Sequence, residues 1–274
     1  MIRDITIGQY YPAKSVLHRL DPRVKLVGTL LYLISLFLFN SIPGYVMTTL
    51  FLIIIIKMSR VPFSFIVRGL KPVFMLLMIT VLFNLFLTRD GAVLFHAWIF
   101  TITEGGLRTA VYMAIRLIYL IIGSSLMTLT TTPNDLTDGM ERLLNPLKAV
   151  HVPVHEISMM MSIALRFIPI LLEETDKIMK AQIARGADFE SGNIIQRAKA
   201  MIPLLVPLFI SAFRRANDLA MAMEARCYRG GDGRTKMKPL HYESRDHIAY
   251  AVVWGYLVLM IVFGRLLSGT VIPF

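Results

Sequence analysis

Residues 25–56, KLVGTLLYLISLFLFNSIPGYVMTTLFLIIII, contain two apolar runs with a short break between them. The break, NSIPG (40–44), holds a Pro-Gly pair, and such pairs mark turns. A transmembrane helix needs about 20 mostly apolar residues, so each run has to borrow flanking residues in order to cross a bilayer. The stretch therefore predicts a tight hairpin of two transmembrane helices, built on residues 25–39 and 45–56.

The rest of the chain has the composition of an integral membrane protein. Of its 274 residues 55% are apolar, and the mean hydropathy of +0.62 is too high for an ordinary soluble domain. Three more apolar runs predict spans at residues 72–87, 107–129 and 247–267. We therefore expect an all-α integral membrane protein with about five transmembrane helices.

The distribution of charge predicts which side of the membrane each part faces. The net charge of +11 could point to nucleic acid, but the hydropathy favours membrane-flanking charge, so no nucleic-acid partner is expected. Lysine and arginine gather in the N-terminal arm and after the second run, at Arg3, Lys14, Arg19, Arg23, Lys25, Lys57, Arg60, Arg68 and Lys71, whereas the 40–44 turn has none. The positive-inside rule then places the N-terminus and the long segment 130–245 in the cytoplasm and the tail GTVIPF outside.

Segment 130–245 has nearly balanced charge and a helical pattern, which indicates a folded region. Residues 131–148 predict a short capped helix, and residues 155–186 and 194–231 predict two long helices, each apolar at first and amphipathic later. Helices of this kind suit a surface that lies against or just under the bilayer. A further span over residues 201–213 remains open as the alternative. The prolines inside them, Pro169, Pro203 and Pro207, should kink each helix or shift its start. The predicted organisation is a four-span membrane domain (1–129), a cytoplasmic domain (130–245) and a last span (246–274).

The motifs of the common catalytic and metal sites are missing from the sequence. The glycines of RGGDGRT (229–235) lack the Gly-Lys-Ser/Thr of a phosphate-binding loop. His151 and His155 are separated by Pro153, which argues against a helical metal pair. The single cysteine, Cys227, excludes an intramolecular disulfide and a cysteine zinc cluster. We expect no catalytic, cofactor-binding or metal-binding residues in this chain.

The predicted spans also carry few groups that could move ions. They contain no Asp or Glu, and only Asn84 and Arg116 are strongly polar at depth. A proton-driven or sodium-driven carrier needs ionisable residues along its pathway. Arg116 could be a functional charge, although pairing within the helix bundle is the simpler interpretation.

Two arginines stand in matching settings at the ends of the two long helices. The triplets are Ala184-Arg185-Gly186 and Ala225-Arg226-Cys227. An arginine in the last turn of a helix interacts favourably with the helix dipole, so one such residue needs no further account. Small neighbours, however, keep a helix tip slim, and a guanidinium offers a planar fork of donors to a partner's carboxylate. The pair therefore favours a docking role as strongly as a capping role.

Five motifs together resemble the transmembrane T component of energy-coupling factor (ECF) transporters, the EcfT/CbiQ-like family. They are LHRLDPRVKL (17–26), TTTPNDL (130–136), ALRFIPILLEE (164–174), AQIARGADF (181–189) and RRANDLAMAMEARCY (214–228). They stand in the family's order and extend over nearly the whole chain. The resemblance implies a multi-pass protein of a bacterial or archaeal cell membrane, whose cytoplasmic coupling domain is inserted before the last span.

The resemblance also implies a function and a set of partners. The chain would be a non-catalytic coupling subunit of an ATP-driven importer of vitamins or other micronutrients. In that family two short motifs, commonly Ala-Arg-Gly, dock into two ABC-type ATPase subunits, and here they correspond to the two triplets, with Cys227 in place of glycine. ATP and magnesium would be used by the partner ATPases, no cofactor would be bound by this chain, and a membrane-embedded S component would bind the substrate.

A group of methionines on the two long helices is a candidate surface for the S component. Methionine side chains are flexible and polarisable, which suits a surface that meets more than one partner. Packing between the two helices explains them equally well. The residues are Met159, Met160, Met161, Met221 and Met223.

Two other classes of function remain open at this point. A self-sufficient secondary transporter or channel would transport substrate without partners. A membrane enzyme would need a nucleophile or a metal constellation, which the sequence does not offer. The transported substrate, and whether S components are dedicated or shared, are not decided by the sequence.

Overall fold

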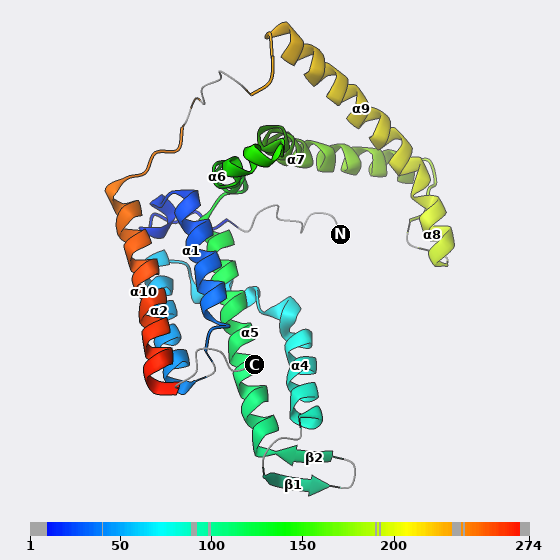
Figure 1. Ribbon diagram of the computed structural model, residues 1–274. Helices are drawn as coiled ribbons and strands as arrows, with labels where there is room; N and C mark the ends of the chain where they lie inside the picture. The colour runs from blue at the N-terminus through cyan, green and yellow to red at the C-terminus, as the bar shows by residue number, and fades with distance from the viewer. Residues whose placement is uncertain are drawn as a thin grey trace. The chain divides into compact units, whose positions relative to one another are not determined.

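The computed structural model describes residues 10–39, 41–88, 92–97, 100–189, 191, 193–231, 237 and 239–268. The described chain is almost wholly helical, which confirms the predicted all-α class (Figure 1). It divides into two compact units. We call residues 10–140 with 240–268 the membrane unit and Glu141–Pro239 the inserted unit. Arg3, Arg89, Gly233 and the tail 269–274 lie outside the described residues.

The membrane unit consists of helices joined by short connections. Its elements are η2 (Leu17–Arg19), α1 (Pro22–Ser35), α2 (Ile42–Ser59), α3 (Phe63–Arg68), η3 (Lys71–Val73), α4 (Phe74–Leu87), α5 (Glu104–Thr130), α10 (Ser244–Ser268) and an antiparallel ribbon of β1 (Val93–Ala97) and β2 (Phe100–Thr103). α6 (Pro133–Leu144) follows α5 and continues across the boundary into the inserted unit. The ribbon was not predicted from the sequence.

Side-chain caps fix where several helices begin. The Asp21 carboxylate accepts the Arg23 N–H at 2.8 Å, and Pro22 occupies the first turn of α1. Thr103 accepts the Gly106 N–H at 3.1 Å and thereby starts α5. Such caps satisfy backbone donors that have no partner within the helix.

The core of the membrane unit lies among α1, α2, α5 and α10. Leu36 and Ile66 are completely buried there. The rings of Phe51 on α2 and Tyr256 on α10 stack with centroids 4.0 Å apart. The last helix therefore packs against the first ones, although most of the chain separates them in sequence.

Arg116 is buried in α5 and binds the turn between α1 and α2. Its Nη2 atom donates to the Phe39 carbonyl at 3.3 Å and to the Tyr45 hydroxyl at 3.2 Å. These contacts hold a turn in place, which agrees with the simpler of the two interpretations of this residue.

The number of helices that could cross a membrane differs from the expected five. Six helical segments of the described residues are long and apolar enough. α1 is not among them, because its 14 residues rise only about 21 Å against a hydrocarbon core of about 30 Å. α4 is equally short and qualifies only together with α3 and η3, as the segment Phe63–Leu87. Two segments that we assigned to the cytoplasmic domain, Val154–Ala184 and Ile195–Ala225, do meet the criterion. Each segment is a continuous helical stretch of 31 residues, and its apolar first half fills a window long enough to cross a bilayer although the second half is charged.

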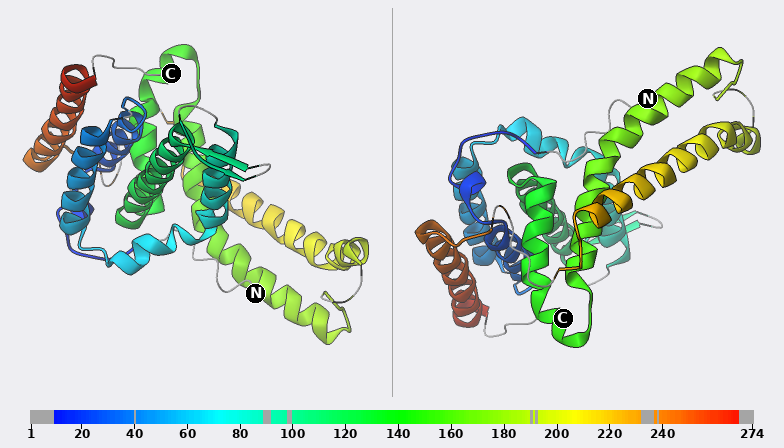
Figure 2. Two further views of the ribbon diagram at one scale, coloured as in Figure 1. Left: turned by 90° about the horizontal axis from the view of Figure 1, so that it is seen from below. Right: turned by 90° about the horizontal axis from the view of Figure 1, so that it is seen from above.

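The inserted unit is a helical hairpin. Its elements are η4 (Asn145–Val150), α7 (Val154–Ala184), α8 (Ile194–Ala200) and α9 (Ile202–Ala225). The two long helices were predicted, but the second is divided into α8 and α9, with Pro203 in the first turn of α9. Pro169 and Pro207 lie inside α7 and α9 without ending them. α7 and α9 contact each other, and Figure 2 shows them as neighbouring long helices joined through α8.

Candidate functional site

The C-terminal end of α7 is closed by a Schellman motif centred on Arg185. The Gly186 N–H donates to the Ile183 carbonyl at 2.9 Å, and the Ala187 N–H donates to the Gln182 carbonyl at 3.0 Å. Gly186 has a φ of 89°, a left-handed conformation that glycine adopts without strain. Arg185 is therefore the last residue before the chain reverses, on a helix end whose carbonyls are already satisfied.

The C-terminal end of α9 has the same cap. The Cys227 N–H donates to the Glu224 carbonyl at 2.8 Å, and the Tyr228 N–H donates to the Met223 carbonyl at 3.1 Å. Cys227 takes the place of Gly186, with a φ of 55°. Arg226 thus occupies the position that Arg185 has on α7, and the cysteine does not change the geometry.

Both arginine side chains are exposed on the inserted unit. Neither guanidinium makes a hydrogen bond or an ion pair with any described residue. In both helices the backbone cap, and not the side chain, satisfies the last carbonyls. The explanation of these arginines as capping groups is therefore weakened, and their donors remain available to a partner.

The two arginines lie at opposite ends of the hairpin, because α7 and α9 run antiparallel. Near the end of α7, the Gln182 side chain donates to the Pro203 carbonyl at the start of α9 (3.2 Å). In the middle, Arg215 pairs with Glu174 at 3.2 Å. With a rise of about 1.5 Å per residue along α9, Arg185 and Arg226 are about 35 Å apart. One partner groove could not hold both.

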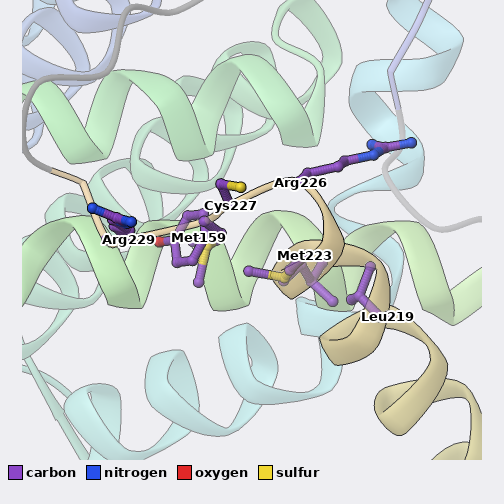
Figure 3. Close-up of a pocket in the computed structure, with 9 residues that line it drawn as sticks. Met159, Leu219, Met223, Arg226, Cys227 and Arg229 are labelled. Atoms are coloured by element: carbon purple, nitrogen blue, oxygen red, sulfur yellow. The ribbon is translucent and has the colours of Figure 1, made fainter.

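A cavity of about 480 Å³ lies beside the Arg226 end (Figure 3). It is formed between the beginning of α7 and the end of α9 and is closed by the chain that follows α9. Its lining residues are Met159, Ile163, Leu219, Met223, Arg226, Cys227, Tyr228, Arg229 and Gly230. In Figure 3 the side chains of Arg226 and Arg229 extend to opposite sides of this cavity. The cavity thus has a mixed lining, with apolar side chains from α7 and α9 and two arginines from the end of α9 and the chain after it.

The five methionines proposed for the S component fall into two groups. Met159 and Met223 line the cavity within the inserted unit. Met160, Met161 and Met221 are exposed, with 58%, 39% and 61% of their surface accessible. The first pair therefore packs between α7 and α9, and the side chains of the other three are exposed to a partner.

A polar cluster that the sequence did not reveal supports the Arg226 end. The Glu141 carboxylate accepts the Ser158 hydroxyl at 3.0 Å and lies 3.0 Å from His155 Nδ1. Gly231 lies directly on the His155 ring, where an added Cβ would come within 2.3 Å of the ring. His155, which we considered as a metal ligand, instead holds the chain that leaves α9. In the described parts of the chain no cluster of His, Cys, Asp or Glu could hold a metal ion.

The left-handed conformation of Cys227 leads to a stability prediction. Replacing it by glycine, Cys227→Gly, should raise the free energy of unfolding by about 1 kcal/mol, since a side chain in this conformation is strained. Cys227→Val should lower it, because a β-branched residue tolerates this conformation least. Thermal unfolding of the purified variants would measure both. Equal melting temperatures for the two variants would contradict the cap geometry.

Known proteins match this chain over most of its length. The family model described as "CbiQ: Cobalt transport protein" matches residues 13–237. The chain is similar to the energy-coupling factor transporter transmembrane protein EcfT of Clostridium kluyveri, with 58% identity over 91% of this chain and 93% of that protein. It is similar to the protein of the same name from Ruminiclostridium cellulolyticum, with 53% identity over 95% and 97%. The EcfT protein of Bacillus subtilis is 51% identical over 90% and 93%. With its apolar helices and two arginine-tipped helix ends, the chain belongs to the CbiQ/EcfT family of energy-coupling factor transporter transmembrane proteins.

Proposed function

We propose that this chain is the coupling (T) subunit of an ATP-driven ECF-type importer of vitamins or other micronutrients. The observation that carries the proposal is the pair of identically capped helix ends, each of which presents an arginine that is unpaired among the described residues. Their separation of about 35 Å fits two partners, one at each end. The family to which the chain belongs supports a place in a transporter of several subunits.

The partners follow from this role. Two ABC-type ATPase subunits dock at the triplets that contain Arg185 and Arg226, and they use ATP and magnesium. A membrane-embedded S component binds the substrate and meets the exposed methionines Met160, Met161 and Met221. This chain binds no cofactor and catalyses no reaction; it transmits the movement of the ATPases to the S component.

The proposed placement in the membrane follows from the distribution of charge. The chain is a multi-pass protein of the cell membrane, with its N-terminus and the inserted unit on the cytoplasmic side. This placement requires that α1, together with its flanking residues, crosses the membrane and that α7 and α9 do not. The lysines and arginines that flank α2 and α4 support this orientation. It brings Arg185 and Arg226 to the compartment that supplies ATP.

Co-purification from native membranes tests the proposal. The tagged chain, extracted in mild detergent, should bring with it two ATPase subunits and at least one small membrane protein, as identified by mass spectrometry. Recovery of the chain without any ATPase would overturn the proposal. The alternative, a self-sufficient transporter or channel, predicts uptake by liposomes that contain this chain alone.

A further inference from the structure

The segment that joins α2 to α4 has one face packed on the protein and one face without a partner. It comprises residues 57–71, KMSRVPFSFIVRGLK, and we call it the connector. Val61 and Ile66 are buried. Gly69 lies so close to α5 that an added Cβ would come within 2.7 Å of Ser125 Oγ. The connector is therefore held firmly against α5, about one turn from the end of that helix.

The other face combines exposed apolar side chains with exposed cations. Phe63, Phe65 and Val67 are exposed, Phe63 with 63% of its surface accessible. Four cations accompany them and none forms an ion pair with a described residue: Lys57, Arg60, Arg68 and Lys71. The connector has no acidic residue, so its local charge is +4. A surface of this kind is complementary to an anionic one.

Arg60, one of these cations, lies at the C-terminal end of α2 in a backbone conformation that favours glycine. Arg60 ends α2 with a φ of 55°, a left-handed conformation in which glycine is the usual residue. The Ser59 hydroxyl, which accepts the Val61 N–H at 3.2 Å, helps to fix this turn. An exposed guanidinium group therefore stands at the turn between α2 and α3.

The position of the connector in the fold indicates what covers this face. α2 (Ile42–Ser59) is a candidate membrane span, and so is the segment Phe63–Leu87, which runs through α3 and η3 into α4. The junction between the two spans, residues 60–62, therefore lies at one surface of the bilayer, and α3 begins at that surface. In Figure 2 the blue-to-cyan ribbon crosses from α2 toward α4. Four cations within the hydrocarbon core would be costly, whereas headgroups accept them. Arg68 lies over the Phe65 ring at 5.0 Å, which places a cation beside an apolar side chain as an interface requires.

We propose that the connector is a binding site for anionic phospholipid headgroups. Phe63, Phe65 and Val67 insert at the boundary between headgroups and acyl chains. The lysines and arginines contact lipid phosphates, to which guanidinium groups bind through two parallel hydrogen bonds. The bound lipids hold the connector, and with it the α2–α4 pair, at a fixed depth in the membrane. The proposal does not depend on the function of the transporter.

Spin-labelled lipids test this site on the full-length chain. The protein is reconstituted in phosphatidylcholine vesicles with a trace of spin-labelled phosphatidylglycerol or phosphatidylcholine, and the motionally restricted fraction is measured. One cation at an anionic surface is worth about fivefold in affinity. We therefore expect a preference for phosphatidylglycerol of at least about fivefold, which high salt reduces by screening. If the unchanged protein bound the two lipids with equal affinity, the proposal would be overturned.

Two variants with the same loss of charge locate the site. The connector variant carries Lys57→Gln, Arg60→Asn, Arg68→Gln and Lys71→Gln, with asparagine at Arg60 because it tolerates the left-handed conformation. The control variant carries Lys177→Gln, Lys180→Gln, Arg197→Gln and Lys199→Gln, all exposed on the inserted unit. The connector variant should lose at least about fivefold of the preference and the control should keep it. Equal loss in both variants would show a general charge effect and overturn the assignment; if the connector variant does not fold, Arg60→Asn alone is compared with Arg197→Gln.

Discussion

Reversing either arginine, as Arg185→Glu or Arg226→Glu, should abolish substrate uptake while the S component still binds its substrate. The proposed partner of each guanidinium is a carboxylate in a groove of an ATPase. Removing one member of such a buried pair costs about 2–5 kcal/mol, which weakens docking by about 30-fold or more. A glutamate adds repulsion between two carboxylates. Uptake by proteoliposomes that contain the complete complex, compared with substrate binding by the same sample, measures the effect.

The caps make these reversals clean tests of docking. Arg185 and Arg226 have φ angles of −86° and −94°, which any residue can adopt, and only their backbone groups take part in the caps. The fold of the inserted unit should therefore survive the change. Arg197→Glu, an exposed charge reversal on α8, is the matched control and should retain uptake. If both helix-end reversals left uptake intact, the docking assignment would be wrong.

The apolar runs predicted most helices of the membrane unit because hydropathy reports burial in lipid directly. α2, α4, α5 and α10 fall where the sequence placed spans. α1 ends at Ser35, four residues before the apolar run does, because the residues after it form the turn that Arg116 holds. The hydrogen bond from Arg116 to the Phe39 carbonyl joins residues far apart in the sequence, so a hydropathy pattern cannot predict it.

The sequence analysis did not predict the β1–β2 ribbon, and it placed the end of α9 too late. Both differences come from the interpretation of short stretches of sequence. Residues 93–103 are rich in aromatic and β-branched residues, a strand signal that was available but lay in what we interpreted as a loop between two spans. Glycine predicted the end of α7 at Gly186 correctly. The same rule placed the end of the second helix at Gly230-Gly231, whereas α9 ends at Ala225 with Cys227 in the left-handed position.

The opposite placement of the two arginine ends could not be predicted from their matching sequences. Two similar triplets at the ends of two helices could lie together or apart, and only the antiparallel packing of α7 and α9 decides between these. The cavity beside Arg226 depends on the same packing. Pairwise contacts between distant segments determine these features, and no periodicity in the chain encodes them.

Asp246 connects the first and last helices of the membrane unit through one buried carboxylate. Its Oδ1 atom accepts the Asp21 N–H at 2.9 Å, and its Oδ2 atom accepts the Glu243 N–H at 2.8 Å. These two N–H groups stand at the starts of α1 and α10. The side chain is almost inaccessible, with 2% of the residue exposed, so water cannot replace it. The Asp246 carboxylate therefore ties Asp21, the residue that caps α1, to the start of α10.

Asp246→Ala should lower the free energy of unfolding by about 3 kcal/mol, because it leaves two backbone donors without an acceptor. For a chain of this size such a loss corresponds to a melting temperature lower by about 10 °C, which thermal unfolding of the purified protein would measure. Glu243→Ala is the matched control, since it removes a carboxylate at the same helix start. The Glu243 side chain is exposed and its ion pair with Arg245 is worth at most about 1 kcal/mol, so the control should melt within about 3 °C of the unchanged protein. If the two variants melted together, the carboxylate of Asp246 would not be what ties α1 to α10.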